Sequence, residues 1–218
     1  YRFKIKDSNT YEGMDKFSLQ KPRIRNYLHE WLFHELLGEG GLAKIKYDFY
    51  KFYLNGDYKG YYALEESFGN NFLKRNNLPN GPIFSTFEEF NRSSGNSKKM
   101  FEVYDKKFWT SDAKNLSITR NSLKKIENYL MGKENFNNVF DVKKWAWFFA
   151  VTDLTYTYHG TLLKSVKFYY NQDTLKFEPI GFDGHRTFPN FSKYNKSTDF
   201  QVTNFSIALQ AINGKLTS

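Results

Sequence analysis

The segment over residues 145–188 places the strongest constraint on how this chain can fold. It reads as an apolar helix over residues 145–154, a loop over residues 155–165, and a hairpin whose two strands cover residues 166–170 and 175–182. One aspartate, Asp153, stands near the end of the helix, and a second, Asp183, directly follows the last strand. The order is therefore helix, aspartate, loop, hairpin and aspartate, with Gly184 next in the chain.

Protein kinases present their catalytic base and their metal ligand in this order. Phosphoryl transfer depends mainly on positioning and on divalent cations, so two carboxylates placed in this way suit it. A plain helix and hairpin would read similarly, with Asp153 in solvent and Asp183 in a simple turn. However, a carboxylate near a helix C-terminus opposes the helix dipole, and Asp153 has apolar neighbours, which favours a functional role.

The composition fits one large domain or two lobes. The 218 residues are 40% hydrophobic and 20% aromatic, which suffices for a core and argues against disorder. The absence of cysteine excludes disulfides, thiolate metal sites and a cysteine nucleophile. A formal charge of +9 favours anionic partners, but the lysines occur in short pairs that do not indicate a nucleic-acid groove. No apolar run is long enough to predict a membrane span.

Strand signals are concentrated early in the chain and helix signals after residue 115, which predicts an α+β fold. Strands are expected at residues 1–6, 17–20, 47–54, 58–64 and 83–84, and helices at residues 24–37, 71–75, 116–130 and 142–153. Asn55-Gly56 is a strong hairpin turn signal, and Asp141 is a good N-cap for the helix expected at residues 142–153. The polar segment 88–97 predicts a boundary between a strand-rich part, residues 1–97, and a helical part, residues 98–218. Both ends read as cut, so we expect the domain to continue beyond them.

Two other groups of polar residues are candidate sites. His29, Glu30 and His34 resemble the zinc-protease motif His-Glu-x-x-His, but a spacing of five turns the two rings apart by about 140°. They cannot share one ion, so both histidines are expected on a helix surface or at an interface. Glu65 and Glu66 are neighbours on a predicted strand and should point to opposite faces, so one of them can face a cleft.

Six segments carry a resemblance to a known family: Phe17 to Gln20, Arg25 to Leu28, Gly56 to Glu66, Phe72 to Arg75, Lys167 to Asn171 and Glu178 to Gly184. Together they resemble the CotH kinase family, atypical protein-kinase-like proteins first known from bacterial spore coats. The resemblance covers residues 1–212. It implies a reduced two-lobe kinase fold, with a strand-rich N-terminal lobe and a helical C-terminal lobe. It further implies ATP and magnesium as cofactors, and a protein substrate that is often secreted or part of a coat. An extracytoplasmic or bacterial-surface location is favoured for this reason.

The resemblance also assigns roles by position. Asp153 matches the catalytic-loop aspartate, which orients or deprotonates the acceptor hydroxyl. Asp183 matches the metal-binding aspartate, and Glu66 matches a glutamate that pairs with a phosphate-binding lysine.

Three departures from the family pattern leave the activity open. Ser165 stands at the position of an asparagine metal ligand, and serine binds magnesium more weakly. Ser85 stands where the family has a lysine, and His185 stands where a second acidic residue often occurs. The loop before Ser165 is also longer than in conventional kinases. His159 and Lys164 lie within it and are candidate phosphate contacts.

The leading hypothesis is therefore a CotH-like, kinase-fold protein that transfers phosphate from ATP to a protein serine or threonine. One alternative is a catalytically impaired pseudokinase or a surface or coat scaffold. A weaker one is a basic module that binds anionic polymers or glycans. The first hypothesis expects Asp153 and Asp183 to face one cleft, with Glu66 nearby.

Overall fold

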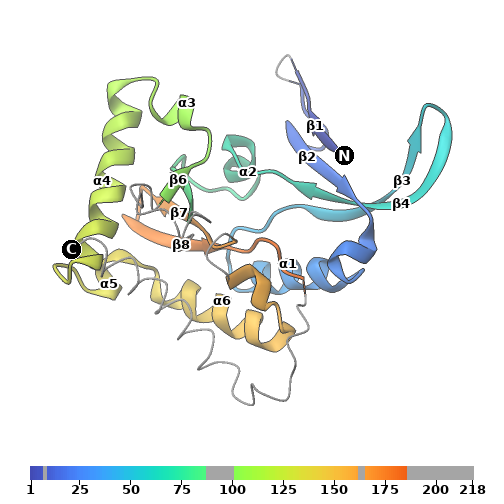
Figure 1. Cartoon of the computed structure of the whole chain (residues 1–218). Helices are drawn as coiled ribbons and strands as arrows, with labels where there is room; N and C mark the ends of the chain where they lie inside the picture. The colour runs from blue at the N-terminus through green and yellow to red at the C-terminus, as the bar shows by residue number, and fades with distance from the viewer. Residues whose placement is uncertain (7–8, 87–100, 162–164, 186–218) are drawn as a thin grey trace, which may run out of the picture.

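The computed structural model describes residues 1–6, 9–86, 101–161 and 165–185. These residues form a mixed α+β fold with two four-stranded antiparallel sheets and helices packed around them (Figure 1). The α+β class predicted from the sequence is confirmed. The predicted boundary at residues 88–97 and the candidate residue Lys164 lie outside the described residues.

The first sheet contains the N-terminal strands in the order β1-β2-β4-β3. Its strands are β1 (Arg2–Lys4), β2 (Lys16–Gln20), β3 (Tyr47–Leu54) and β4 (Asp57–Glu66). Asn55 and Gly56 connect β3 to β4 with φ values of 52° and 87°, as a tight hairpin turn requires and as the sequence predicted. The last five residues of β4 are buried, so this strand carries Glu65 and Glu66 into the interior.

The second sheet has the order β6-β5-β7-β8. Its strands are β5 (Ile83–Thr86), β6 (Phe101–Val103), β7 (Lys167–Asn171) and β8 (Lys176–Ile180). The β7–β8 hairpin confirms the one predicted before Asp183. Because β5 belongs to the predicted strand-rich part and the other three strands follow it, this sheet takes strands from both parts of the predicted division.

Six α-helices and two 3₁₀ turns are found among the described residues. They are η1 (Pro22–Arg25), α1 (His29–Glu39), α2 (Asn70–Arg75), α3 (Lys106–Trp109), α4 (Ala113–Leu130), α5 (Phe136–Val139), α6 (Val142–Thr155) and η2 (Tyr158–Thr161). The predicted N-cap of α6 is confirmed, since the Asp141 carboxylate accepts a hydrogen bond from the Lys144 amide at 3.1 Å. Asp112 caps α4 in the same way.

The single helix expected from residue 24 to residue 37 is wrong. The chain makes the η1 turn, breaks, and starts α1 only at His29. Asn26 and Tyr27 adopt positive φ values of 53° and 61°, a left-handed conformation that cannot continue a right-handed helix. The break leaves Arg25 outside α1, where its side chain points into the region around Asp183.

A core of buried side chains joins α1 and α6 to the second sheet. Its members include Phe33, Leu37, Trp145, Phe148, Val151, Phe168 and Phe177. The fully buried Trp145 donates its indole N–H to the Phe177 carbonyl oxygen at 3.0 Å, which fixes α6 against β8. In Figure 1, α1 and α6 lie next to each other on one side of this sheet, and α1 also contacts β3 of the first sheet. The core therefore fixes both elements that lead to the candidate site.

Gly81 precedes β5 at a close approach between backbones, and replacing it should destabilise the fold. A Cβ atom at this position would overlap the Tyr170 carbonyl oxygen of β7, and backbone cannot move aside cheaply. We expect Gly81→Ala to lower the free energy of unfolding by about 1–3 kcal/mol, measured by urea denaturation. Gly38→Ala in α1 is the matched control. Its Cβ meets only the flexible Lys44 side chain, so it should be neutral or stabilising. Equal losses in both variants would contradict this account.

Candidate functional site

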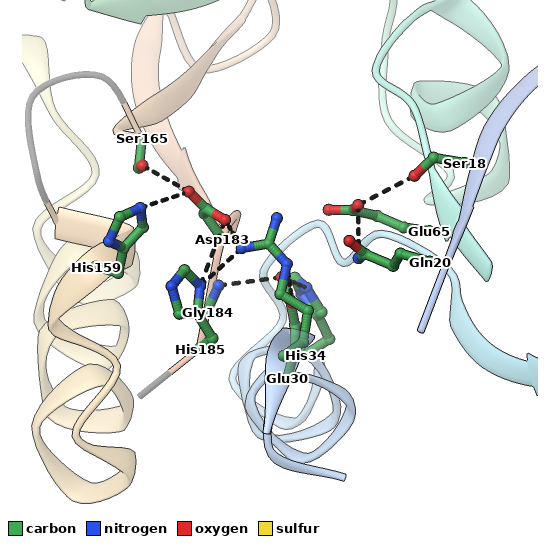
Figure 2. A network of polar contacts seen from close by, with 11 residues as sticks. Ser18, Gln20, Glu30, His34, Glu65, His159, Ser165, Asp183, Gly184 and His185 are labelled. Atoms are coloured by element: carbon green, nitrogen blue, oxygen red, sulfur yellow. Dashed lines mark hydrogen bonds and ion pairs between the residues drawn. The ribbon is translucent and has the colours of Figure 1, made fainter. Parts of the chain in front are cut away.

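Asp183 lies at the centre of a cluster of polar side chains that come from distant parts of the chain (Figure 2). Its Oδ2 accepts a hydrogen bond from the Ser165 hydroxyl at 3.1 Å and lies 2.8 Å from His159 Nε2. Its Oδ1 pairs with the guanidinium of Arg25 and lies 3.4 Å from His185 Nδ1. The Asp183 side chain is only 13% exposed, so these four neighbours form most of its surroundings.

The loop after α6 places His159 close to Asp183. Helix α6 ends at Thr155, and the next residue, Tyr156, has a φ of 55° that turns the chain toward η2. Gly160 follows His159, and a Cβ atom there would lie 2.8 Å from the Phe182 carbonyl oxygen. Only glycine lets η2 approach the strand end this closely, so His159 reaches the carboxylate from the side opposite to α1 (Figure 2).

Glu30 of α1 is fully buried directly behind this cluster. Its carboxylate accepts a hydrogen bond from the Gly184 amide at 3.1 Å and pairs with Arg25 Nε at 3.1 Å. His34 Nε2, one helical turn along, lies 3.7 Å away. Burial alone would raise the pKa of Glu30, but His34, Arg25 and the Gly184 amide outweigh it and hold that pKa below its usual value. Glu30 is therefore a buried, charged anchor for the chain around Asp183.

Arg25 connects the two carboxylates. Its Nε pairs with Glu30, and its Nη1 reaches both Asp183 and, at 2.7 Å, His185 Nδ1. Burial and the charge of Arg25 lower the pKa of His185, so its imidazole is neutral near pH 7. A neutral His185 accepts the hydrogen bond from Arg25 through Nδ1.

Glu65 and Glu66 point to opposite faces of β4, as the alternation of a strand predicts. Glu65 accepts hydrogen bonds from Ser18 at 3.2 Å and from Gln20 at 3.0 Å. In Figure 2 its carboxylate points toward the side where Asp183 lies. Burial, and then the negative charge of Glu30, raise the pKa of Glu65 to about 7.

Glu66 makes a different set of contacts. Both of its carboxylate oxygens accept hydrogen bonds from Arg75 of α2, and the Lys46 amide donates to it at 2.9 Å. The partner of Glu66 is thus an arginine from a neighbouring helix, in a bidentate ion pair that ties α2 to the first sheet.

A groove of about 530 Å³ lies between the first sheet and the end of β8. It is lined by three cationic side chains, Arg2, Lys4 and Lys16, and by five aromatic rings, Phe3, Phe17, Phe68, Tyr104 and Phe182. Glu65 and Glu66 also line it, and Lys16 pairs across its rim with Asp105 at 3.0 Å. Phe182 lines the groove, and Asp183 follows it in the chain. Glu65, which also lines the groove, is close enough to Glu30 and Arg25 for their charges to shift its pKa.

Lys167 lies on β7 directly opposite Ser85 of β5, so the two side chains share one face of the second sheet. It is only 4% exposed, and its Nζ lies 5.1 Å from the centre of the Phe182 ring. Burial lowers the pKa of Lys167 to about 8. The buried amine of Lys167 therefore lies beside Ser85, the residue that stands where the family has a lysine.

The structure brings together three of the six residues that the sequence singled out, namely Asp183, Ser165 and His159. Glu66 lines the groove but pairs with Arg75. Asp153 is half-buried in the last turns of α6. Within the described ranges, it is not one of the residues whose possible metal-ligating atoms converge around Asp183.

Three contributors to the site received no role from the sequence: Arg25, Glu30 and Glu65. For Glu30 a signal was present, since Glu30 and His34 stand four residues apart on one helix face. Of the two positions expected for His34, a helix surface or an interface, the surface is wrong, since the side chain is only 1% exposed and its ring lies 6.0 Å from that of Tyr47 on β3. The buried Glu30 gives it a polar partner, which makes burial tolerable.

Magnesium fits poorly with the residues around Asp183. It prefers an octahedral set of oxygen ligands, usually including one or two carboxylates. Around Asp183, the described residues supply one carboxylate and the Ser165 hydroxyl, along with two imidazoles and the positive charge of Arg25. His185 stands where the family often has a second acidic residue, and it offers nitrogen instead of a further carboxylate oxygen.

The family model described as CotH kinase protein matches residues 1–213 of the chain. The protein therefore belongs to the CotH kinase family, as its sequence motifs indicated. No curated protein matches the chain. Among the described residues, no helix is both long and apolar enough to span a membrane.

The raised pKa of Glu65 predicts a pH-dependent difference in stability. Its folded pKa of about 7 exceeds the unfolded value near 4.5, so the ionised form is penalised in the folded state. The penalty is absent below pH 4.5, grows as the pH rises, and is complete above pH 7. Glu65→Gln removes it. Relative to wild type, the variant should therefore gain about 3 kcal/mol between pH 4 and pH 8. Urea denaturation at the two pH values measures this gain, and a difference independent of pH would contradict the assignment.

Proposed function

We propose that this CotH family member binds a nucleotide in the groove beside Glu65 and transfers its terminal phosphate to a protein serine or threonine hydroxyl. The observation that carries the proposal is the position of the groove. Its cationic and aromatic lining includes Phe182, and Asp183 is the next residue in the chain. The volume of about 530 Å³ lies within the range of small-molecule sites.

The lining of the groove suits the two halves of a nucleotide. The aromatic side chains Phe3, Phe17 and Tyr104 offer flat surfaces for a base. Arg2, Lys4 and Lys16 carry positive charge that attracts phosphates. With the base in the aromatic part, the phosphates extend toward the end of β8.

The residues around Asp183 then lie at the end of the nucleotide that carries the terminal phosphate. Arg25 and Lys167 supply positive charge close to Phe182 and Asp183, where the terminal phosphate would lie. By family position, Asp153 orients the acceptor hydroxyl and receives its proton. Glu66 and Arg75 hold α2 against the first sheet and so keep one wall of the groove in place.

The two-lobe kinase arrangement is part of the same proposal. The first sheet and α2 would form the N-terminal lobe, and the second sheet with α4 and α6 would form the C-terminal lobe. Family membership also supports ATP as the phosphate donor, a secreted or coat protein as substrate, and an extracytoplasmic or bacterial-surface location.

One observation favours the alternative of a pseudokinase that binds ligands without transferring phosphate. Asp183 is paired with Arg25 and contacted by two histidines, which leaves a single carboxylate already neutralised by an internal cation. A protein in this state could still use the groove for binding. The experiments below separate the two functions.

Removal of a groove cation should weaken nucleotide binding. We expect Lys16→Ala to raise the Kd for ATP about ten-fold, the effect of losing one charge-assisted phosphate contact. Isothermal titration calorimetry, with Mg²⁺ and with Mn²⁺ in separate series, measures this. Lys59→Ala is the matched control, because Lys59 also pairs with an aspartate, Asp57 at 3.2 Å, but lies on the exposed β4 end far from the groove lining. Absence of ATP binding by the folded wild type would refute the nucleotide proposal.

Phosphate transfer is tested separately from binding. Radiolabelled ATP should label the chain itself or casein, and Asp153→Asn should abolish labelling while leaving the Kd for ATP within about two-fold. Labelling that survives Asp153→Asn would remove this residue from the mechanism. Binding without labelling in the wild type would favour the pseudokinase.

A further inference from the structure

We propose that His159, Asp183 and His185 form a binding site for one divalent transition-metal ion of the Zn²⁺, Co²⁺ or Mn²⁺ type, in preference to Mg²⁺. This inference concerns the metal of the same site and deepens the proposed function. The ion is bound by the chain itself, however, so binding can be tested without nucleotide, and its failure can be told apart from failure of nucleotide binding.

The geometry of the three side chains fits a single ion. One ligand atom from each residue lies within 4.8 Å of the other two. Tetrahedral ligands at about 2.1 Å from a metal lie about 3.4 Å apart, so a separation of 4.8 Å would have to close by about 1.4 Å on binding. The Asp183 carboxylate already lies 2.8 Å from His159 Nε2 and 3.4 Å from His185 Nδ1. The two imidazole rings contact each other with centroids 4.2 Å apart, and both lie next to the Asp183 carboxylate (Figure 2).

The ligand atoms select the class of metal. Two imidazole nitrogens and one carboxylate oxygen form a set that suits Zn²⁺, Co²⁺ or Mn²⁺, whereas Mg²⁺ prefers oxygen ligands alone. Ser165 donates a hydrogen bond to Asp183 Oδ2 at 3.1 Å, an outer contact that orients the carboxylate. His185, which stands where the family often has an acidic residue, supplies a nitrogen that suits a transition metal.

Arg25 acts as an internal substitute for the ion. Its Nη1 contacts both Asp183 Oδ1 and His185 Nδ1, so the lone pairs that would bind a metal already converge on one positive group. The same guanidinium is tied through Nε to the buried Glu30 at 3.1 Å. The Nη1 end can therefore rotate away while Arg25 keeps an ion-pair partner. A metal ion and Arg25 compete for Asp183 Oδ1 and His185 Nδ1. The affinity for metal therefore depends on Arg25 as well as on the metal ligands.

Titration with Co²⁺ tests the site directly. The whole chain, purified without a histidine tag and without nucleotide, should develop the visible absorption of bound Co²⁺ with a stoichiometry of one. His159→Ala and His185→Ala should each weaken binding by at least about ten-fold. Zn²⁺ should displace Co²⁺ and remove the absorption, whereas a large excess of Mg²⁺ should not. Arg25→Gln should bind more tightly than wild type, because the competing cation is gone.

His29→Ala is the matched control, because this histidine lies at the start of α1 and outside the cluster. It should leave the Co²⁺ affinity unchanged. The proposal fails if the wild type binds no Co²⁺, if binding survives both cluster variants, or if Mg²⁺ displaces Co²⁺ at comparable concentration. Should Arg25→Gln lose native circular dichroism, the two histidine variants decide the question by themselves.

Discussion

The buried ion pair between Glu30 and Arg25 holds the site of this protein together. Glu30 lies on α1, Arg25 precedes that helix, and Gly184 donates to the same carboxylate from the loop after β8. Three segments thus meet at one buried charge. Removing one partner of such a pair leaves the other unpaired in the interior, which costs about 3–5 kcal/mol. Gly184 allows the approach because a side chain there would overlap the Phe33 ring. The position of Asp183 therefore depends on α1, although the sequence places the two about 150 residues apart.

The break before α1 explains why Arg25 can serve two carboxylates. In a helix running continuously from residue 24, Arg25 would belong to the first turn, and the rotation of that helix would set the direction of its side chain. The left-handed conformation of Asn26 and Tyr27 instead turns the chain so that Arg25 lies beside Glu30 and reaches Asp183. The same arrangement limits Asp183, because a carboxylate paired with a guanidinium is a weaker ligand for an added cation. The structure that positions the site also controls its access to metal.

Local signals in the sequence were sufficient for much of the fold and for little of the site. The Asn55-Gly56 turn and the Asp141 cap depend on residues a few positions apart, and both were predicted correctly. The break at Asn26 and Tyr27 carries no glycine or proline, so nothing local announced it. Alternation placed Glu65 and Glu66 on opposite faces. It could not assign Glu66 to Arg75, because that contact depends on where α2 packs. The neighbours of Asp183 likewise follow from tertiary contacts.

If the proposed function holds, the balance of charge around Asp183 would decide whether this CotH family member acts as a kinase or as a binding protein. Phosphoryl transfer requires that the negative charge of the phosphates be neutralised near the metal-binding aspartate. A magnesium site achieves this with oxygen ligands and the ion, and in this chain His185 offers nitrogen where the family often has an acidic residue. Arg25 supplies a permanent positive charge in its place. With two imidazoles in the ligand set, a transition metal could still displace Arg25 from Asp183, and the displaced guanidinium would remain beside the phosphates. Activity would then depend on which cation holds Asp183, since only the metal-bound arrangement leaves Arg25 free to contact substrate.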